Sequence, residues 1–439
     1  MREETKIERI GKKMIFLGLI LFLFVPLLQT VSGFKNYIRP LDGAYYPEGD
    51  VDFSWQGWFH GDYQSQKDKF LKENFGLHNY YFRLICQINF SLFKKANATY
   101  LVVGKDNYLY ESDYIDAYYG RDFIGEKKIE NFVKKLKSVQ DTLRNHNKLI
   151  FLVLAPGKAC FYPEYIPENY KTKKTKTNYE GFIDAIKRNA LNHIDFYNYY
   201  TSKKYTSTYP LYPQLGIHWS NYASVYAFDS IVKYTEKELS TDLPDISIKS
   251  VTVHDSLKAP DNDAVKSLNL YKDPKTFKMA YCKWEIKNDR TKNKKLNLLV
   301  VSDSFWWYIY GTNLTNSTFA TSSFWYYNEE IYPESYSSPL LVSQIDYTAK
   351  IRKADVIILL HTEATLNKFG GGFVDMAYET YCHPGLKKEK IQEMKGKIRS
   401  TSEWFKNIII KAGERNISVD SMLTLDAIYT LESMANDKK

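Results

Sequence analysis

A run of aliphatic residues that stops at three small polar residues constrains this chain more than any other stretch. Residues 296–301 read Leu-Asn-Leu-Leu-Val-Val, which is typical of a strand buried on both faces. Ser302, Asp303 and Ser304 follow directly. In open α/β sheets ligands bind beyond the carboxyl ends of the strands, so Ser304 is a candidate nucleophile at such an edge. The alternative is that the three residues only cap the next helix, because all are good N-cap residues.

Helical and strand patterns alternate along much of the chain. Residues 127–146 carry apolar side chains at helical spacing, and residues 148–154 then form an apolar strand. A second helix over 179–192 precedes a strand over 193–197, and a further strand covers 355–360. Strands that alternate with helices predict a parallel sheet with helices on both faces, so the expected fold class is α/β.

A histidine stands where another helix is expected to begin. Gly216, Ile217, His218 and Trp219 precede a helical pattern that starts near Tyr222. In the first turn of that helix, His218 would feel the positive end of the helix dipole, which favours the neutral imidazole that a general base needs. The alternative is a partly buried histidine with one hydrogen bond to a loop.

The N-terminus has the pattern of a signal anchor. Five basic residues precede an apolar run over residues 14–28, which approaches the length of a spanning helix if it extends to residue 34. Basic residues before such a run keep the N-terminus in the cytoplasm and send the rest across the membrane. We therefore expect anchoring in the inner membrane through residues 14–34, with the bulk of the chain in the periplasm. Cleavage near Val31-Ser32-Gly33 is the alternative and would give a secreted or periplasmic protein.

Composition narrows the classes of ligand. The net charge is +9, but no nucleic-acid motif accompanies the basic residues, so we expect no nucleic-acid partner. The four cysteines, Cys86, Cys160, Cys282 and Cys382, are far apart, and we expect no metal and no cofactor. Disulfides and free thiols both fit their spacing. Aromatic residues make up 16% of the chain, which mildly favours a carbohydrate partner.

Several of these blocks, taken together, resemble one family. Val301-Ser302-Asp303-Ser304-Phe305 resembles the Gly-Asp-Ser-Phe block of SGNH hydrolases, and Gly216-Ile217-His218-Trp219 is similar to the His-Trp block of their alginate O-acetyltransferase branch. In that branch the histidine block precedes the serine block, as in a circularly permuted fold, and the same order holds here. The leading blocks also agree, and they are Trp55-x-x-Trp58, Val102-Val103-Gly104-Lys105-Asp106-x-x-Leu109-Tyr110, Pro156-x-Lys158 and Tyr162-Pro163-Glu164-x-x-Pro167. The resemblance covers most of residues 50 to 370.

The resemblance implies an SGNH-hydrolase-like, flavodoxin-like sheet and a Ser–His mechanism. Ser304 would attack an acetyl ester as His218 takes its proton, and N–H groups near Ser304 would hold the oxyanion. The family commonly places an aspartate two residues before the histidine to orient the ring, but here that position is Gly216. A Ser–His dyad, another carboxylate and a degenerate site all stay open. The candidate orienting acids are Asp261, Asp263 and Glu363.

Three more side chains are candidates for binding substrate. Lys158 lies at the carboxyl end of a predicted strand, where it could stabilise an anionic sugar or the transition state. Trp219 and Trp306 could form a flat platform for a sugar ring. The alternatives are a solvated lysine and tryptophans buried in the core.

The expected organisation has four parts. Residues 1–34 form a cytoplasmic stub and the anchor, and residues 35–98 form a helical, aromatic segment that packs on the core. Residues 99–375 form the SGNH-hydrolase-like catalytic domain, in which the polar residues 237–295 are an insertion. Residues 376–439 form a helical C-terminal segment.

The resemblance implies an extracytoplasmic O-acetyltransferase that moves acetyl groups onto hydroxyls of an exported polysaccharide. Its partners would be the polysaccharide acceptor and an acetyl donor, supplied through a membrane-bound O-acyltransferase. With water as the acceptor, the same residues give a carbohydrate acetylesterase. A chain that keeps the fold without the chemistry would be a non-catalytic polysaccharide-binding or assembly component.

Overall fold

The chain forms two compact units. One comprises Met1–Val103 and Ala264–Lys275, and the other comprises Gly104–Asp263 and Thr276–Lys439. The computed structural model describes residues 6–32, 39–43, 51–74, 76–287, 296–382, 388–415 and 417–436.

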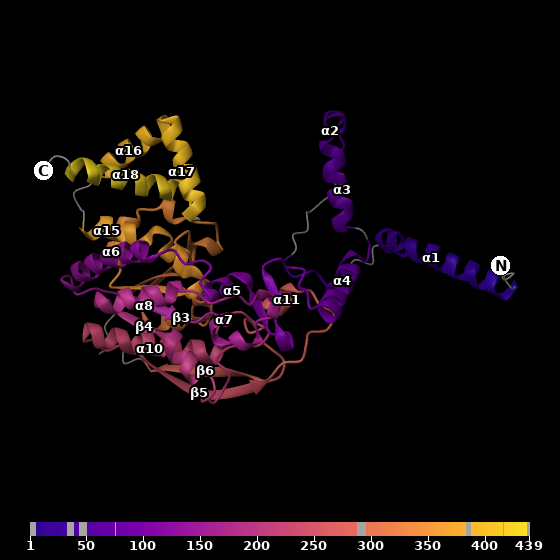
Figure 1. Ribbon diagram of the computed structural model, residues 1–439, viewed down its shortest axis with the longest axis horizontal. Coiled ribbons are helices and arrows are strands. Elements are labelled where there is room, and N and C mark those ends of the chain that lie inside the picture. The colour runs from indigo at the N-terminus through magenta and orange to yellow at the C-terminus, as the bar shows by residue number, and fades with distance from the viewer. Residues whose placement is uncertain are drawn as a thin grey trace. The chain divides into compact units, whose positions relative to one another are not determined.

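The first unit is mostly helical. Its elements are α1 (Lys6–Ser32), α2 (Trp55–His60), α3 (Asp62–Asn74), α4 (His78–Phe93) and the short strand β1 (Leu101–Val103) (Figure 1). The break between α3 and α4 falls near Gly76. Within α1, the 21 residues Arg9–Gln29 have a mean hydropathy of 2.0 and are long and apolar enough to cross a membrane. Residues 33 and 34 of the predicted anchor lie outside the described residues.

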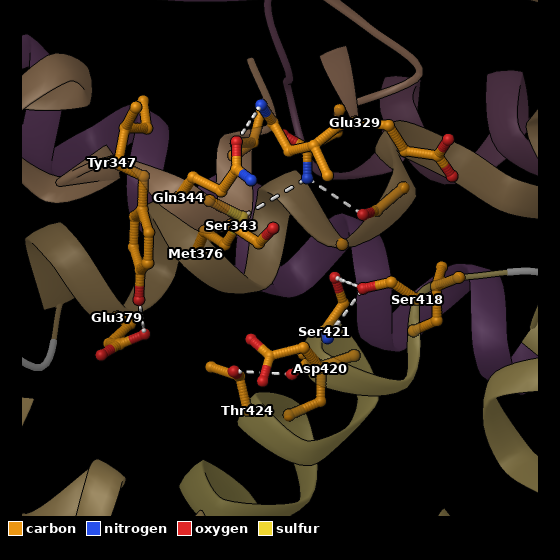
Figure 2. Close-up of a pocket in the computed structure, with 18 of the residues that line it drawn as sticks. Glu329, Ser343, Gln344, Tyr347, Met376, Glu379, Ser418, Asp420, Ser421 and Thr424 are labelled. Atoms are coloured by element: carbon orange, nitrogen blue, oxygen red, sulfur yellow. Dashed lines mark hydrogen bonds between the residues drawn. The ribbon is translucent and has the colours of Figure 1, made fainter. Parts of the chain in front are cut away.

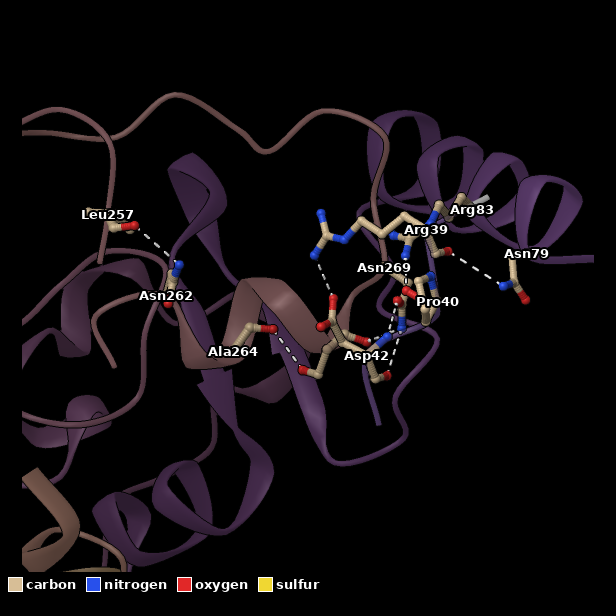
Figure 3. A network of polar contacts seen from close by, with 10 residues as sticks. Arg39, Pro40, Asp42, Asn79, Arg83, Leu257, Asn262, Ala264 and Asn269 are labelled. Carbon is tan, nitrogen blue, oxygen red and sulfur yellow. Dashed lines mark hydrogen bonds and ion pairs between the residues drawn. The ribbon is translucent and has the colours of Figure 1, made fainter. Parts of the chain in front are cut away.

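A small polar network joins distant segments of the first unit. The Asp42 N–H donates to Asn269 Oδ1 at 2.8 Å, and Asn269 Nδ2 donates back to the Asp42 carbonyl at 3.1 Å (Figure 3). Arg83 donates to the Pro40 carbonyl at 2.7 Å. Through Asn269, the segment 264–275 is therefore hydrogen-bonded to the N-terminal part of the same unit.

A six-stranded sheet forms the centre of the second unit. In spatial order its strands are β4 (His193–Asp195), β3 (Leu149–Ala155), β10 (Val356–Thr362), β7 (Asn297–Ser302), β8 (Thr321–Tyr326) and β9 (Glu330–Tyr332). The first five are parallel, which confirms the α/β prediction. The expectation of a wholly parallel sheet was wrong, because β9 runs antiparallel to β8. Residues 327–329 are too short a connection for a parallel crossover.

Helices cover both faces of this sheet. One face packs in a single apolar cluster against α6 (Glu126–Arg144), α8 (Asn178–Arg188) and α15 (Phe373–Cys382). Ile150, Leu152 and Leu154 of β3 point into that cluster. On the other face Phe151 meets Tyr234 of α10 (Asn221–Leu239), with ring centroids 4.9 Å apart. The alternation along β3 thus explains why the strand is apolar without interruption.

The predicted insertion contains a sheet of its own. β5 (Asp245–His254) and β6 (Met279–Lys287) pair antiparallel, and this pairing was not expected from the weak periodicity of residues 237–295. Residues 237–239 belong to α10, and residues 288–295 lie outside the described residues. The short helix α11 (Asp263–Ser267) begins at one of the candidate acids.

The C-terminal helices form a separate core. α16 (Lys388–Ser400), α17 (Ser402–Arg415) and α18 (Val419–Asn436) bury Ile398, Ile408 and Leu423 among themselves, which confirms the helical prediction. All four cysteines are free thiols. The second unit also contains, among its described residues, β2 (Leu109–Glu111) and the α-helices α5 (Ser112–Tyr119), α7 (Lys158–Phe161), α9 (Phe196–Lys203), α12 (Trp306–Gly311), α13 (Leu314–Thr318) and α14 (Tyr347–Lys353).

Candidate active site

Ser304 lies in the turn between β7 and α12, at the carboxyl edge of the sheet. Asp303 holds this turn, because one of its carboxylate oxygens accepts from the Phe305 N–H at 3.0 Å. Its other oxygen accepts from the N–H and hydroxyl of Thr362 at 2.9 and 3.0 Å, and from the Thr365 hydroxyl at 2.8 Å. Thr362 ends the neighbouring strand β10, so Asp303 fixes Ser304 relative to the sheet. The Phe305 N–H, one of the groups expected to hold an oxyanion, donates to Asp303 instead.

His218 lies in the loop before α10 and not in its first turn. Ser220 is the N-cap, and its hydroxyl accepts from the Ala223 N–H at 3.2 Å. The expectation that His218 lies in the first turn of the helix, where the dipole would favour the neutral imidazole, was therefore wrong. The ring Nε2 of His218 lies 2.8 Å from Ser304 Oγ, across 86 positions of sequence. The serine and histidine blocks thus meet at the same edge of the sheet.

Asp263 supplies a carboxylate at the place where the sequence lacks one. Its Oδ2 lies 2.5 Å from His218 Nδ1, and its Oδ1 accepts from the Ile217 N–H at 2.9 Å. A Cβ atom built at Gly216 would lie 2.6 Å from the Asp261 carbonyl oxygen, closer than real side chains approach. An aspartate therefore does not fit at position 216 in this loop, and the carboxylate beside the imidazole comes from a different segment.

The other two candidate orienting acids bind elsewhere. The buried Asp261 accepts from the Tyr308 hydroxyl at 2.5 Å, and burial raises its pKa to about 6. Glu363 accepts from the Gly157 N–H at 2.6 Å, and burial raises its pKa to about 7. The prediction that Asp261 or Glu363 orients the imidazole was wrong, because Asp263 already binds Nδ1 of His218.

Carboxylates surround the imidazole of His218. Burial by itself would lower its pKa, but Asp263, Glu111 and Asp303 together raise the pKa above its ordinary value of 6.5. Glu111 ends β2, and burial raises its own pKa to about 7. Sequence reasoning missed Glu111, and no motif in the sequence signals it.

Lys158 is buried beneath the loop that carries His218. Its Nζ donates to the carbonyls of Gln214 at 2.6 Å and Gly216 at 2.5 Å, and burial lowers its pKa well below the ordinary value. Tyr108 and Tyr110 face the same ammonium, with ring centroids 5.8 and 5.7 Å away. The expectation that Lys158 binds a sugar was wrong, and so was the solvated alternative, because the side chain is fully enclosed.

Trp219 and Trp306 are both fully buried. Trp219 Nε1 donates to the Phe305 carbonyl at 3.2 Å and so ties the histidine block to the serine turn. Trp306 packs against Phe228, with ring centroids 6.2 Å apart, and its Nε1 has no partner among the described residues. The prediction of a sugar platform was wrong for both, because neither indole reaches solvent.

Tyr327 is a neighbour of Ser304 that the sequence did not reveal. It lies in the turn between β8 and β9 with a φ of 52°, and its N–H donates to the Ser302 carbonyl at 2.9 Å. Its side chain lies close to Ser304, and burial raises its pKa, so the phenol stays protonated. Sequence reasoning missed it because neither flanking strand was predicted.

The site therefore combines a hydroxyl, an imidazole and a carboxylate in one line of hydrogen bonds. Such an arrangement can remove the hydroxyl proton as the oxygen attacks an electrophilic carbon. Among the described residues, no three His, Cys, Asp or Glu side chains are grouped so as to hold a metal ion.

This chain is similar to several known proteins. Residues 101–297 match the family model described as "SGNH hydrolase-like domain, acetyltransferase AlgX". This segment contains His218 and Asp263 and ends before Ser304. The "Probable alginate O-acetylase AlgJ" of Pseudomonas syringae pv. tomato is 24% identical over 180 residues. The match spans 40% of this chain and only 40% of the relative's length.

Two solved structures are also similar. The O-acetyltransferase domain of Pseudomonas putida AlgJ has a TM-score of 0.40 and 14% identity, over 64% of this chain and 99% of that domain. Pseudomonas aeruginosa AlgX has a TM-score of 0.42 and 11% identity, over 67% of this chain and 70% of that structure. The family model and the AlgJ relative support the predicted resemblance of this chain to the alginate O-acetyltransferase-like family of SGNH hydrolase-like proteins.

Proposed function

We propose that this chain is an extracytoplasmic O-acetyltransferase that moves acetyl groups onto hydroxyls of an exported polysaccharide. The observation that carries the proposal is the line of hydrogen bonds from Asp263 through His218 to Ser304, at 2.5 and 2.8 Å. The names of the similar proteins, an alginate O-acetylase and an acetyltransferase, support acetyl as the group transferred.

In the first half-reaction His218 Nε2 takes the proton of Ser304 while Oγ attacks the carbonyl carbon of the acetyl donor. The Tyr327 hydroxyl lies beside the reacting oxygen and can donate to the developing oxyanion. As the tetrahedral intermediate collapses, the donor's C–O bond breaks and His218 returns the proton to the departing oxygen. The acetyl group is then esterified to Ser304 and the imidazole is neutral again.

In the second half-reaction a sugar hydroxyl gives its proton to His218, and its oxygen attacks the acetyl carbon. The bond to Ser304 Oγ breaks, and Oγ recovers the proton. Asp263 holds the ring through Nδ1, so that Nε2 faces Ser304 in both halves and the imidazolium is stabilised. The case for a non-catalytic component rested on the missing aspartate at position 216. Asp263 takes the place of that aspartate beside His218 and so weakens this case.

We further propose that α1 anchors the chain in the inner membrane and that the site works in the periplasm. The exposed apolar stretch Arg9–Gln29 supports this placement. The acetyl donor would then come across the membrane through a membrane-bound O-acyltransferase. Cleavage of α1 as a signal sequence would leave the site in the same compartment.

The test is hydrolysis of 4-nitrophenyl acetate by the full chain in detergent. We expect Ser304→Ala to lower the rate by about 10³-fold or more, with Ser338→Ala, an exposed serine away from the site, as the matched control. Peptide mass spectrometry should find acetyl on Ser304 in a rapidly quenched reaction. An unchanged rate in Ser304→Ala would remove the serine from the mechanism. Acetylated oligosaccharide formed in competition with water would identify a transferase, and free acetate alone would identify an esterase.

A further inference from the structure

A long cleft begins beside the candidate active site and reaches the C-terminal helices. Its near part is lined by Glu111, Tyr114, Tyr327 and His361. Its far part, with a volume of about 640 Å³, is lined by residues of the segment from Leu341 to Tyr347, of α15 and of α18. The two parts adjoin, because they share the lining residues Asn328, Glu329, Gly371, Ile417, Ser418 and Ser421.

The near part of the cleft adjoins the turn that carries Ser304. Thr365 lines it and donates through its hydroxyl to Asp303 at 2.8 Å. Tyr327 lines it and donates through its N–H to the Ser302 carbonyl at 2.9 Å. A molecule in the near part would therefore lie close to the segment from Ser302 to Ser304.

Two buried polar atoms in the near part lack partners. Asn328 Oδ1 and His361 Nε2 have no hydrogen-bond partner among the described residues, although only 7% and 3% of these side chains are exposed. Each side chain is held from its other end, Asn328 by a bond from Nδ2 to the Gly371 carbonyl at 3.0 Å and His361 by Thr365 at 3.2 Å. Buried polar groups are nearly always paired, so these two atoms need a partner that the described residues do not supply. Sugar hydroxyls both donate and accept, and they can satisfy both atoms.

The charge of the cleft selects among sugars. Its described lining carries six acidic side chains, Glu111, Asp113, Glu329, Asp346, Glu379 and Asp420, against two lysines, Lys368 and Lys395. Lys395 and Asp420 pair with each other at 2.9 Å, and Asp420 also accepts from Arg399 at 2.8 Å, so the other acids of the lining face Lys368 alone among the lining cations described. Figure 2 shows Glu379 with Tyr347 on one side of the far part, and Asp420 with Ser421 and Thr424 on the other. A chain of sugar carboxylates in this cleft would face like charges with few cations to pair with.

We propose that this cleft is the acceptor subsite and that the acceptor is a neutral or amino-sugar glycan rather than a polyuronate. This inference rests on the proposed function, because it takes Ser304 as the point of acetyl transfer. The acceptor chain lies along the cleft toward α18, with the hydroxyl to be acetylated in the near part. Its other hydroxyls pair with Asn328 and His361.

The test is binding to full-chain Ser304→Ala in detergent, measured by saturation-transfer NMR and calorimetry. The probes are three hexasaccharides of equal length, namely cellohexaose, the glucosamine hexamer and the mannuronate hexamer. We expect the first two to bind and the mannuronate hexamer to bind at least about tenfold more weakly at low salt. Equal or tighter binding of the mannuronate hexamer, or binding of none of the three, would overturn the proposal.

Paired variants locate the binding. Glu329→Lys should narrow the difference in affinity between cellohexaose and the mannuronate hexamer, whereas Glu238→Lys on the exposed face of α10 should leave it unchanged. Ser343→Trp places bulk in the far part and should weaken all binding, with Ser338→Trp as the control. Unchanged affinities in both cleft variants would contradict the assignment. Because Ser304→Ala cannot form an acyl-enzyme, these affinities are independent of the 4-nitrophenyl acetate rates, so the cleft and the acetyl chemistry can fail separately.

Discussion

The Asp263 carboxylate lies 2.5 Å from Nδ1 of His218, although 45 positions of sequence separate the two residues. Asp263 also accepts from the N–H of Ile217, so it fixes both the ring and the backbone that carries it. The imidazole therefore presents Nε2 to Ser304 without an acid at position 216.

We expect Asp263→Asn to lower kcat for acetyl-ester hydrolysis by about 10⁴-fold, because an amide can hold the ring in the wrong tautomer and cannot stabilise the imidazolium. The measurement is steady-state hydrolysis of 4-nitrophenyl acetate. Asp261→Asn is the matched control, since Asp261 binds Tyr308 and its amide oxygen can still accept that bond. An equal loss in both variants would assign Asp263 a merely structural role.

The carboxylates around His218 predict the pH profile. Because they raise its pKa above 6.5, the imidazole is protonated at mildly acidic pH, and kcat/KM should fall there with an apparent pKa above 6.5. The raised pKa also stabilises the folded chain at low pH, and this contribution is lost as the pH rises through the folded-state pKa. Removing a nearby negative charge should reverse the shift.

Glu111→Gln should therefore move the acid limb of the profile to lower pH. Glu111 is one of the charges that raise the pKa of His218, and glutamine keeps its shape without its charge. The profile of 4-nitrophenyl acetate hydrolysis measures the change, with Glu238→Gln as an exposed control. A limb that stays in place would mean that Glu111 is neutral across this range or too distant to act.

Lys158→Met should destabilise the chain by about 3 kcal/mol, because it removes a buried donor from the carbonyls of Gln214 and Gly216, of which Gln214 keeps the Leu109 N–H. Those carbonyls belong to the loop before His218, so kcat should fall together with the stability of the fold. Thermal unfolding and hydrolysis rates are measured in parallel. Lys233→Met, in which an exposed lysine of α10 is replaced, should change neither.

The two buried tryptophans allow a comparison within one site. Trp219→Phe removes the hydrogen bond from Nε1 to the Phe305 carbonyl, whereas Trp306→Phe removes an N–H that has no partner in the described structure. We expect Trp219→Phe to be the more destabilising by about 1–2 kcal/mol, since both changes remove a similar volume. Thermal unfolding measures the difference. A larger loss for Trp306→Phe would show that packing, rather than this hydrogen bond, dominates.

The central strands and the helices beside them could be predicted because their signals are local. The apolar runs that became β3, β7 and β10 need only burial on two faces, and the helical spacing in α6 and α8 is visible within each segment. β8 and β9 escaped prediction, because their aromatic residues have no clear alternation and their turn places Tyr327 and Asn328 at positive φ. The pairing inside the insertion was missed for a similar reason.

By itself the sequence determined the α/β class, the apolar N-terminal helix, and Ser304 and His218 as partners. Only the tertiary structure decided which carboxylate meets the imidazole, why position 216 holds glycine, and that Glu111 and Tyr327 lie beside the site. It also showed that Lys158, Trp219 and Trp306, which were candidates for binding substrate, are buried side chains. The physical reason is that hydrogen bonds, close contacts and local charge depend on distances between segments far apart in the chain, and no pattern within one segment records those distances.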